Sequence, residues 1–264
     1  MTTPGRLSVD SEGKVRGNVA INYNDPWPCV NGRLGVTGTM SGVLEHTMVA
    51  NLPSCIASFN NPSRQASAHF GIAQDGTVHQ FGPLGRGWEA WHAMAANATW
   101  YGIEHADDGN PNNPLTDAQI AASAQVVECL SAFAGFPLQV TDSVTGHGYG
   151  THSMGGAAWG GHTCPDLPPK HVRSAQRPAI IDLAKLIRAS TRTPLPSGRC
   201  HADGHTSLAG LAQRQGCGVP DIWWSTAAGM AAAGNTGFGD LQRPYMAAGQ
   251  WDALMPSGMI LWLP

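Results

Sequence analysis

The chain has 264 residues, of which 42% are hydrophobic, so it is long enough to bury the core of a medium-sized domain and to hold a smaller second one. Charged residues make up only 12% and the net charge is −3, which disfavours the broad basic surface of a duplex DNA-binding protein. No apolar run approaches the ~18–20 residues of a membrane span, so we expect neither a nucleic-acid partner nor membrane insertion.

The N-terminal residues 1–18 are polar and lack the basic-then-apolar plan of a secretory signal, so we expect synthesis in a cytoplasm. The six cysteines are spread along the chain without a C-x-x-C pair, which favours free thiols over a disulfide framework. Cys200 and Cys217 are the one pair close enough in sequence to suggest a local bridge.

The strands expected first in chain order are short. Residues 42–48 form an apolar run typical of a buried strand, with His46 near its C-terminal end. Residues 68–74 and 77–81 flank Asp75–Gly76, a dipeptide that tolerates the positive φ of a tight turn, and predict a β-hairpin. Residues 100–106 are another candidate strand.

Two helices are expected next. Thr116 is a good N-cap, Gln119 completes a capping box, and Gly135 ends the apolar period, so a helix is predicted over 117–134. A second helix is predicted over 175–189, with Pro178 in or before its first turn. Strands and helices in mixed order indicate an α/β or α+β domain with helices packed on a sheet.

A change of composition marks a domain boundary after the second helix. Residues 189–200 contain Pro, Ser and Thr and show no hydrophobic period. The sequence therefore predicts a domain over 1–190, a linker over 191–199 and a second domain over 200–264.

The strongest local signal for chemistry lies in the Gly-rich residues 151–166, which show no helix or strand pattern. They contain His152, His162 and Cys164, and imidazole and thiolate donors suit Zn²⁺. A catalytic zinc needs three protein ligands and one open position, and His46 is a natural third donor. The alternatives are a flexible surface loop and a structural His46, because spacing alone does not select it from the 11 histidines.

A set of motifs in a fixed order narrows these choices. They are Glu45–His46–Thr47, Ser67–Ala68–His69–Phe70, Trp91–His92–Ala93, Tyr101–Gly102–Ile103–Glu104, and His152 followed by Thr163–Cys164–Pro165. Together, over about residues 35–190, they resemble the zinc-dependent N-acetylmuramoyl-L-alanine amidases of the type-2 class, which share the peptidoglycan-recognition-protein fold. The Gly-rich segment before Cys164 looks like endolysins of phages that infect actinobacteria.

The resemblance implies a mixed α/β fold, with a central sheet flanked by helices, and one catalytic Zn²⁺. Its ligands fall on His46, His152 and Cys164, with His147 as the rival for the second position. A fourth ligand at His162 and a competing one at Asp166 are alternatives; Asp166, which replaces a usual Gly, is expected instead to cap the following segment.

Further roles follow from the same resemblance. Glu104 matches a catalytic Glu that moves a proton, the alternative being an ion pair with an Arg. His162 stands where relatives often have a Lys that steadies the developing oxyanion. His69 and His92 match the lining of a substrate groove, or else simply pack. Trp159 lies between the ligand-bearing segments, and its aromatic face suits stacking on sugar in such a groove, the alternative being core packing. Many relatives have Tyr where this chain has Ala68.

The C-terminal part is similar to a lysin-motif (LysM) module. Residues 203–216 resemble the start of such a module, and the apolar, strand-like residues 255–264 resemble its end. The resemblance implies a small α+β domain that binds N-acetylglucosamine-containing glycan. The alternative is a small stabilising domain whose Trp residues form a core.

The predicted function is cleavage of the amide bond between N-acetylmuramic acid and L-Ala of peptidoglycan, whose glycan strand and stem peptide are the partners. The alternatives are a non-catalytic peptidoglycan binder and a zinc peptidase acting within the stem peptide. We expect a monomeric phage endolysin that is made in the host cytoplasm and acts on the cell wall after release.

Overall fold

The computed structural model describes residues 7–17, 19, 21–34, 38–85, 87–167, 171–189, 198–201 and 260–263. The chain divides into two compact units, one formed by Gly5–Ile181 and the other by Met1–Pro4 with Asp182–Pro264. The candidate site residues all belong to the first unit. In the described part of the chain, no helix has the length and apolar character needed to cross a membrane.

A six-stranded mixed sheet with the order β10-β5-β9-β6-β7-β3 forms the centre of the first unit. All neighbouring strands are parallel except β6 and β7, which form the predicted hairpin around Gly76 at φ 84°. The strands are β3 (Ile21–Tyr23), β5 (Gly42–Thr47), β6 (Phe70–Ile72), β7 (Val78–Gln80), β9 (Trp100–His105) and β10 (Gly148–Thr151). The predictions for β5, β6, β7 and β9 are confirmed, whereas β3 and β10 were not predicted.

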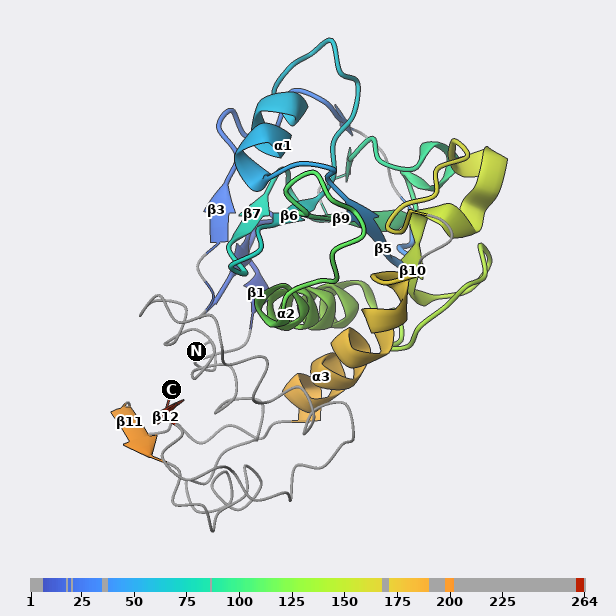
Figure 1. Ribbon diagram of the computed structural model, residues 1–264. Coiled ribbons are helices and arrows are strands. Elements are labelled where there is room, and N and C mark those ends of the chain that lie inside the picture. The colour runs from blue at the N-terminus through green and yellow to red at the C-terminus, as the bar shows by residue number, and fades with distance from the viewer. Residues whose placement is uncertain are drawn as a thin grey trace. The chain divides into compact units, whose positions relative to one another are not determined.

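Helices cover both faces of this sheet (Figure 1). Helix α2 (Asp117–Ala134) has the predicted bounds, and Thr116 and Gln119 form the predicted capping box. Its Ser123 Oγ atom lies at hydrogen-bond distance, 2.7 Å, from Nε2 of His105 on β9. Helix α1 (Leu52–Phe59), which was not predicted, packs on the opposite face of β6, where Leu52 lies over Gly71. Helix α3 (Arg177–Ala189) begins two residues later than expected, after the 3₁₀ turn η3 (Ser174–Gln176).

The remaining elements of the first unit are short. β1 (Ser8–Val9) pairs with β2 (Val15–Arg16), and β4 (Arg33–Leu34) pairs with β8 (Trp88–Glu89), both antiparallel. The 3₁₀ helices are η1 (Met94–Ala96) and η2 (His152–Trp159). The expectation of a pattern-free loop over 151–166 is therefore wrong for His152–Trp159, where repeated glycines hide the helical turns from a periodicity argument.

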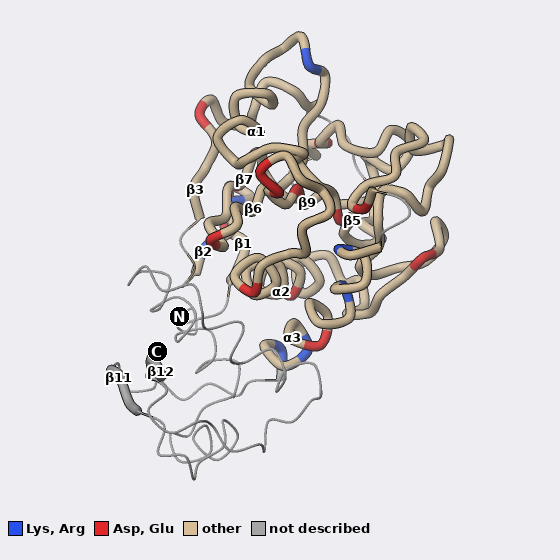
Figure 2. The backbone as a smooth tube through the Cα atoms, viewed as in Figure 1, with Lys and Arg blue, Asp and Glu red and all other residues tan. Residues whose placement is uncertain are grey.

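The mixed α/β fold predicted from the sequence is confirmed, since helices cover both faces of a mixed sheet. Charged residues are sparse along the described backbone, and neither sign forms a long run (Figure 2). Cys29, Cys55, Cys129 and Cys164 form no disulfide, as expected. The proposed pairing of Cys200 with Cys217 lies outside the described residues.

The second unit contains an antiparallel pair, β11 (Gly198–His201) with β12 (Ile260–Leu263). The strand-like character expected for the apolar end of the chain is confirmed over Ile260–Leu263. Most of the predicted linker and the LysM-like residues 202–259 lie outside the described residues, so the division into two domains with a linker stays a prediction.

Candidate metal centre

Three adjacent parallel strands bring the candidate residues into one row. The register pairs His46 on β5 with Glu104 on β9, and Glu45 on β5 with Thr151 on β10. His152 follows Thr151 directly, so it continues the row on the other side of His46. The site thus lies at the carboxyl ends of parallel strands, which is where open α/β sheets commonly bind their ligands.

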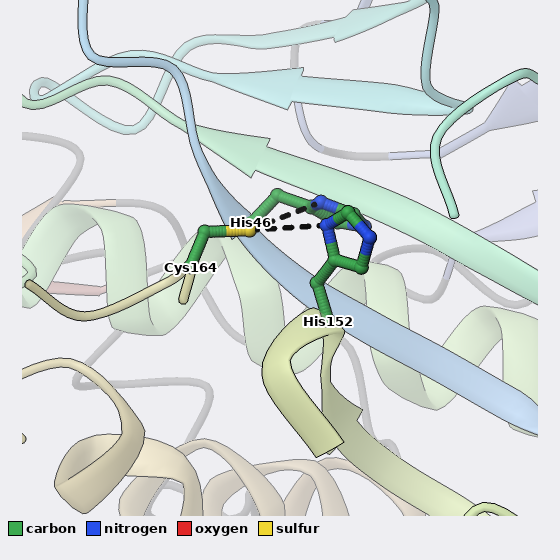
Figure 3. Close-up of side chains that lie close together, drawn as sticks. All are labelled: His46, His152 and Cys164. Atoms are coloured by element: carbon green, nitrogen blue, oxygen red, sulfur yellow. Dashed lines mark hydrogen bonds between the residues drawn. The ribbon is translucent and has the colours of Figure 1, made fainter. Parts of the chain in front are cut away.

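His46, His152 and Cys164 converge into a compact donor cluster (Figure 3). The Cys164 Sγ lies 3.2 Å from His152 Nδ1 and 3.5 Å from His46 Nδ1. The three donor atoms are all within 4.8 Å of one another. His147, the rival for the second position, is exposed and precedes β10, so the structure does not bring it to the cluster.

The hydrogen bonds of the two histidines show which ring nitrogen faces the cluster. His152 Nε2 lies 2.6 Å from the carbonyl oxygen of Trp159, and because a carbonyl only accepts, Nε2 carries the hydrogen. Burial lowers the pKa of His152 and also that of His46, so both rings are neutral near pH 7. The Nδ1 atom of His152 therefore presents a lone pair to Cys164.

The chemistry of this donor set fits a zinc ion. His46 Nε2 is occupied by the Nδ1 atom of His92 at 3.0 Å, so His46 also turns its Nδ1 toward Cys164. Burial raises the pKa of the Cys164 thiol, so without a cation the sulfur keeps its proton. That single proton can be donated to only one of the two imidazole Nδ1 atoms that face the sulfur. A dication among the three satisfies every donor and holds the sulfur as thiolate, and two imidazoles with one thiolate form a typical zinc ligand set.

Glu104 is oriented toward the same cluster. Its Oε1 lies 3.9 Å from His46 Nδ1, and its side chain is 15% exposed. Its Oε2 is buried and has no hydrogen-bond partner within the described residues, and no ion pair with Arg is seen there. Burial, with a smaller contribution from Asp107, raises the pKa of Glu104 to about 8. The carboxyl group thus faces the donor cluster with one oxygen left unpartnered among the described residues.

His162 and Asp166 flank the cluster without joining it. The exposed ring of His162 stacks on the ring of His152, with centroids 4.7 Å apart and planes at 27°. Asp166 Oδ1 accepts hydrogen bonds from the backbone N–H groups of Arg173 and Ser174, at 2.8 and 3.3 Å. Asp166 therefore caps the segment that leads into α3, in agreement with the expected capping role.

A cavity of about 810 Å³ opens above the cluster. Besides the three candidate ligands it is lined by Glu104, His92, Trp91, Trp159 and His162. His69 does not line it: its ring is 2% exposed, accepts a hydrogen bond from the Gly102 N–H at 3.1 Å, and borders a separate cavity of about 300 Å³. The structure thus brings His92 and Trp159, but not His69, to the cavity above the donor cluster.

Comparison with known proteins decides the family. Residues 37–167 match the sequence profile of a family described as N-acetylmuramoyl-L-alanine amidase. N-acetylmuramoyl-L-alanine amidase A of Achromobacter lyticus is 36% identical over 125 residues, which cover 42% of this chain and 69% of that protein. The chain belongs to the N-acetylmuramoyl-L-alanine amidase family. The resemblance to N-acetylmuramoyl-L-alanine amidases drawn from the ordered motifs is thereby confirmed.

Solved structures of similar proteins include other amidases and hydrolases. The Staphylococcus aureus hydrolase AmiA, solved with its ligand, is 16% identical, with a TM-score of 0.48, over 65% of this chain and 85% of that one. The amidase LysC from Clostridium intestinale is also 16% identical, with a TM-score of 0.42, over 62% of this chain and 99% of that one. In the present chain, the residues that match the family, 37–167, include the three donors, Glu104 and His162.

Sequence reasoning missed one residue that supports the site. The side-chain oxygen of Asn97 accepts hydrogen bonds from the backbone N–H groups of His92 and Ala93, at 2.9 and 2.6 Å. Asn97 follows the Trp91–His92–Ala93 motif and the 3₁₀ turn η1, and no periodic pattern marks it. An Asn just after a motif residue is a weak signal of such a local side-chain-to-backbone bond.

Proposed function

We propose that this chain is a zinc-dependent peptidoglycan hydrolase that cleaves the amide bond between N-acetylmuramic acid and L-Ala of the stem peptide. The convergence of His46 Nδ1, His152 Nδ1 and Cys164 Sγ beneath an open cavity is the observation that carries the proposal. Membership in the N-acetylmuramoyl-L-alanine amidase family supports the choice of this amide bond.

In this proposal His46, His152 and Cys164 hold one zinc ion through two neutral imidazoles and a thiolate. When bound, zinc acts as a Lewis acid that polarises an amide carbonyl and lowers the pKa of water toward ~7. The ligand set contributes a single negative charge, so the site keeps a net positive charge. The open side of the cluster faces the cavity, which leaves room for the scissile amide.

Glu104 moves the proton. Its carboxylate takes a proton from the attacking water and delivers it to the leaving amine. Burial, with a smaller contribution from Asp107, raises its pKa to about 8, while a cation beside it favours the carboxylate, which is the form needed to accept a proton. His162, whose exposed ring borders the cavity, donates a hydrogen bond to the developing oxyanion.

The cavity walls supply surfaces for the sugar and the peptide. Trp91 and Trp159 both line it, and aromatic faces stack on the C–H faces of sugars. Trp159 is 6% exposed and packs against Trp100, so Trp91 offers the larger free face. The buried position of His69 supports a packing role for that residue and does not support direct contact with substrate.

The wider biological role rests on the resemblance alone. We infer that the chain is a monomeric endolysin of a phage that infects actinobacteria, made in the host cytoplasm and acting on the wall after release. We also infer that residues 200–264 form a LysM-like module that binds wall glycan, which would raise the local concentration of the catalytic domain on an insoluble polymer.

Product analysis on purified actinobacterial walls tests the chemistry. We expect the zinc-loaded protein to release intact glycan strands and peptides with free L-Ala amino termini, as identified by mass spectrometry. A chelator and Cys164→Ala each abolish this release, whereas the matched control Cys29→Ala, at a buried thiol outside the cluster, retains it.

Three outcomes would contradict the proposal. Undiminished release of L-Ala termini by chelated, metal-free protein would exclude the zinc mechanism. Tight wall binding by zinc-loaded protein without any product would indicate a non-catalytic binder. Fragments cut between stem-peptide residues would indicate a zinc peptidase.

A further inference from the structure

We propose that His92 is a positioning residue for the metal centre: it accepts a hydrogen bond from His46 and thereby holds the His46 Nδ1 lone pair toward the other two ligands. This inference rests on the proposed zinc site. It gives His92 a role different from the substrate contact that the family resemblance implies for it.

The hydrogen bonds run from His46 through His92 to the backbone carbonyl of Trp100, and this carbonyl fixes the direction of each one. His92 Nε2 lies 3.0 Å from the backbone carbonyl oxygen of Trp100, which accepts only, so Nε2 carries the hydrogen. The Nδ1 atom of the neutral His92 ring is then an acceptor, and it lies 3.0 Å from His46 Nε2. His46 must therefore carry its hydrogen on Nε2, which leaves Nδ1 as the metal-binding atom.

The second imidazole ligand is anchored in the same way but directly. His152 Nε2 donates to the carbonyl oxygen of Trp159 at 2.6 Å. Both carbonyls thus belong to tryptophans, and the rings of Trp100 and Trp159 lie 5.9 Å apart in one buried cluster with Leu44. Two residues of one packed cluster therefore hold both imidazoles through their backbone carbonyls, directly for His152 and through His92 for His46.

The environment of His92 leaves its ring no freedom. A Cβ atom added at Gly102 would lie 2.8 Å from both Cγ and Nδ1 of His92, so the ring packs directly on the β9 backbone. Its backbone N–H is held by Asn97 at 2.9 Å. Both ring nitrogens are already engaged, so the ring has no free polar atom to offer a substrate in the cavity. These contacts favour positioning of His46 over recognition of substrate.

A pair of isosteric variants separates hydrogen bonding from packing. In His92→Asn, the side-chain oxygen occupies the place of Nδ1 and accepts from His46, whereas His92→Leu has the same shape and no acceptor. His79→Leu, at a buried histidine on β7 outside the cavity lining, is the matched control. Gly102→Ala displaces the His92 ring without changing its chemistry.

The measurement is the zinc dissociation constant of the full chain, obtained by competition with a chromophoric chelator. We expect His92→Leu and Gly102→Ala to weaken zinc binding by about 10–100-fold, the usual effect of losing a partner that orients a metal ligand. We expect His92→Asn to bind close to wild type and His79→Leu to bind unchanged. Thermal unfolding of the metal-free proteins identifies any variant that fails to fold, and the other variants then decide.

Steady-state kinetics at saturating zinc provide a second readout on a soluble muropeptide. A positioning role predicts an unchanged KM for His92→Asn and His92→Leu. A raised KM with unaltered zinc affinity would show that His92 contacts substrate and would overturn the inference, as would His92→Asn binding zinc as weakly as His92→Leu. The failure of wild-type protein to take up zinc would instead refute the proposed function itself.

Discussion

The side chain of Glu104 offers a test that distinguishes the proposed proton transfer from metal binding. It lies beside His46 in the sheet register but is not one of the three clustered donors. Glu104→Gln keeps the shape of the side chain and removes its ability to take up a proton. We expect kcat to fall by about 10²–10⁴-fold, the usual contribution of general acid–base catalysis, while zinc affinity stays near wild type.

The measurement for Glu104 is the initial rate of L-Ala terminus release at saturating zinc, alongside a chelator competition. Glu89→Gln is the matched control, because Glu89 pairs with Arg33 and lies outside the cavity lining. Loss of zinc from Glu104→Gln would make Glu104 a ligand and would contradict the assigned role.

His162 offers a different residue-scale test, because its ring is exposed and its removal costs little packing. If it steadies the oxyanion, His162→Ala should lower kcat by about 10²–10³-fold, as expected for the loss of one such donor. His162→Lys should retain most of the activity, since an ammonium group also donates. His147→Ala, at another exposed histidine, is the control for both rates. Equal rates for His162→Ala and wild type would remove His162 from the mechanism.

The residues that the structure brings into one cluster, His46, His152 and Cys164, were named from the sequence, but the contact of His92 with His46 was not. The resemblance carried by the ordered motifs assigned the three donors and Glu104 to one site. The role of His92 depends on which ring nitrogen faces the Trp100 carbonyl, at 3.0 Å in the folded chain, and spacing contains no information on ring orientation. Only side-chain geometry shows it.

At the scale of elements, the cap of α2 is a quantitative test of local sequence signals. The Thr116 hydroxyl accepts from the Gln119 N–H at 3.1 Å and donates to the Gln74 carbonyl at 2.6 Å, so it ties α2 to the hairpin. We expect Thr116→Ala to lower the free energy of unfolding by about 1–2 kcal/mol, the upper part of the range for caps. Urea unfolding measures this loss, with the exposed Thr145→Ala as control. An unchanged midpoint would show that the cap contributes nothing to stability.

The elements that the sequence did not predict have identifiable physical reasons. β10 contains Gly148 and Gly150, and glycine is depleted in strands, so no β-propensity marked it. Yet a Cβ at Gly42 would clash with the carbonyl oxygen of Gly148, so the close backbone approach of β5 and β10 requires glycine there. α1 has only eight residues, too few for a clear helical period, although Asn51 caps it and Pro53 stands in its first turn.

For the whole molecule, the order of the strands decides which residues meet. β10 and β9 lie on either side of β5, although β5 precedes both in the chain and α2 lies between β9 and β10 in the sequence.

The consequence of that order is visible at the site. Its residues come from the ends of β5, β9 and β10 and from the segment after η2, which are far apart in the chain. Local patterns predicted four of the six strands of the central sheet but not their neighbours, because pairing depends on long-range contacts. The family resemblance brought these residues together before the structure did, and the parallel register explains why they meet.

Buried histidines give the whole molecule a predictable response to acid. Burial lowers the pKa of His79 to about 4 and that of His105 to about 3, so both stay neutral in the folded chain under mildly acidic conditions. In the unfolded chain a histidine takes up a proton near pH 6.5. The unfolded state therefore binds more protons below that pH, and the free energy of unfolding falls as the pH decreases from about 6.5 to 4. Above about pH 7 these groups contribute no slope.

His79→Gln isolates one part of this response. It removes a titrating ring that is 6% exposed, and each pKa unit corresponds to about 1.4 kcal/mol. Between the unfolded pKa of about 6.5 and pH 5, about 2 kcal/mol of the acid-induced loss of stability should therefore disappear. Urea unfolding at pH 7.5 and pH 5, in the presence of chelator so that metal release does not contribute, measures the difference. His147→Gln, at an exposed ring, should leave the wild-type difference intact. If His79→Gln lost as much stability on acidification as wild type, burial of a neutral His79 would not contribute to acid sensitivity.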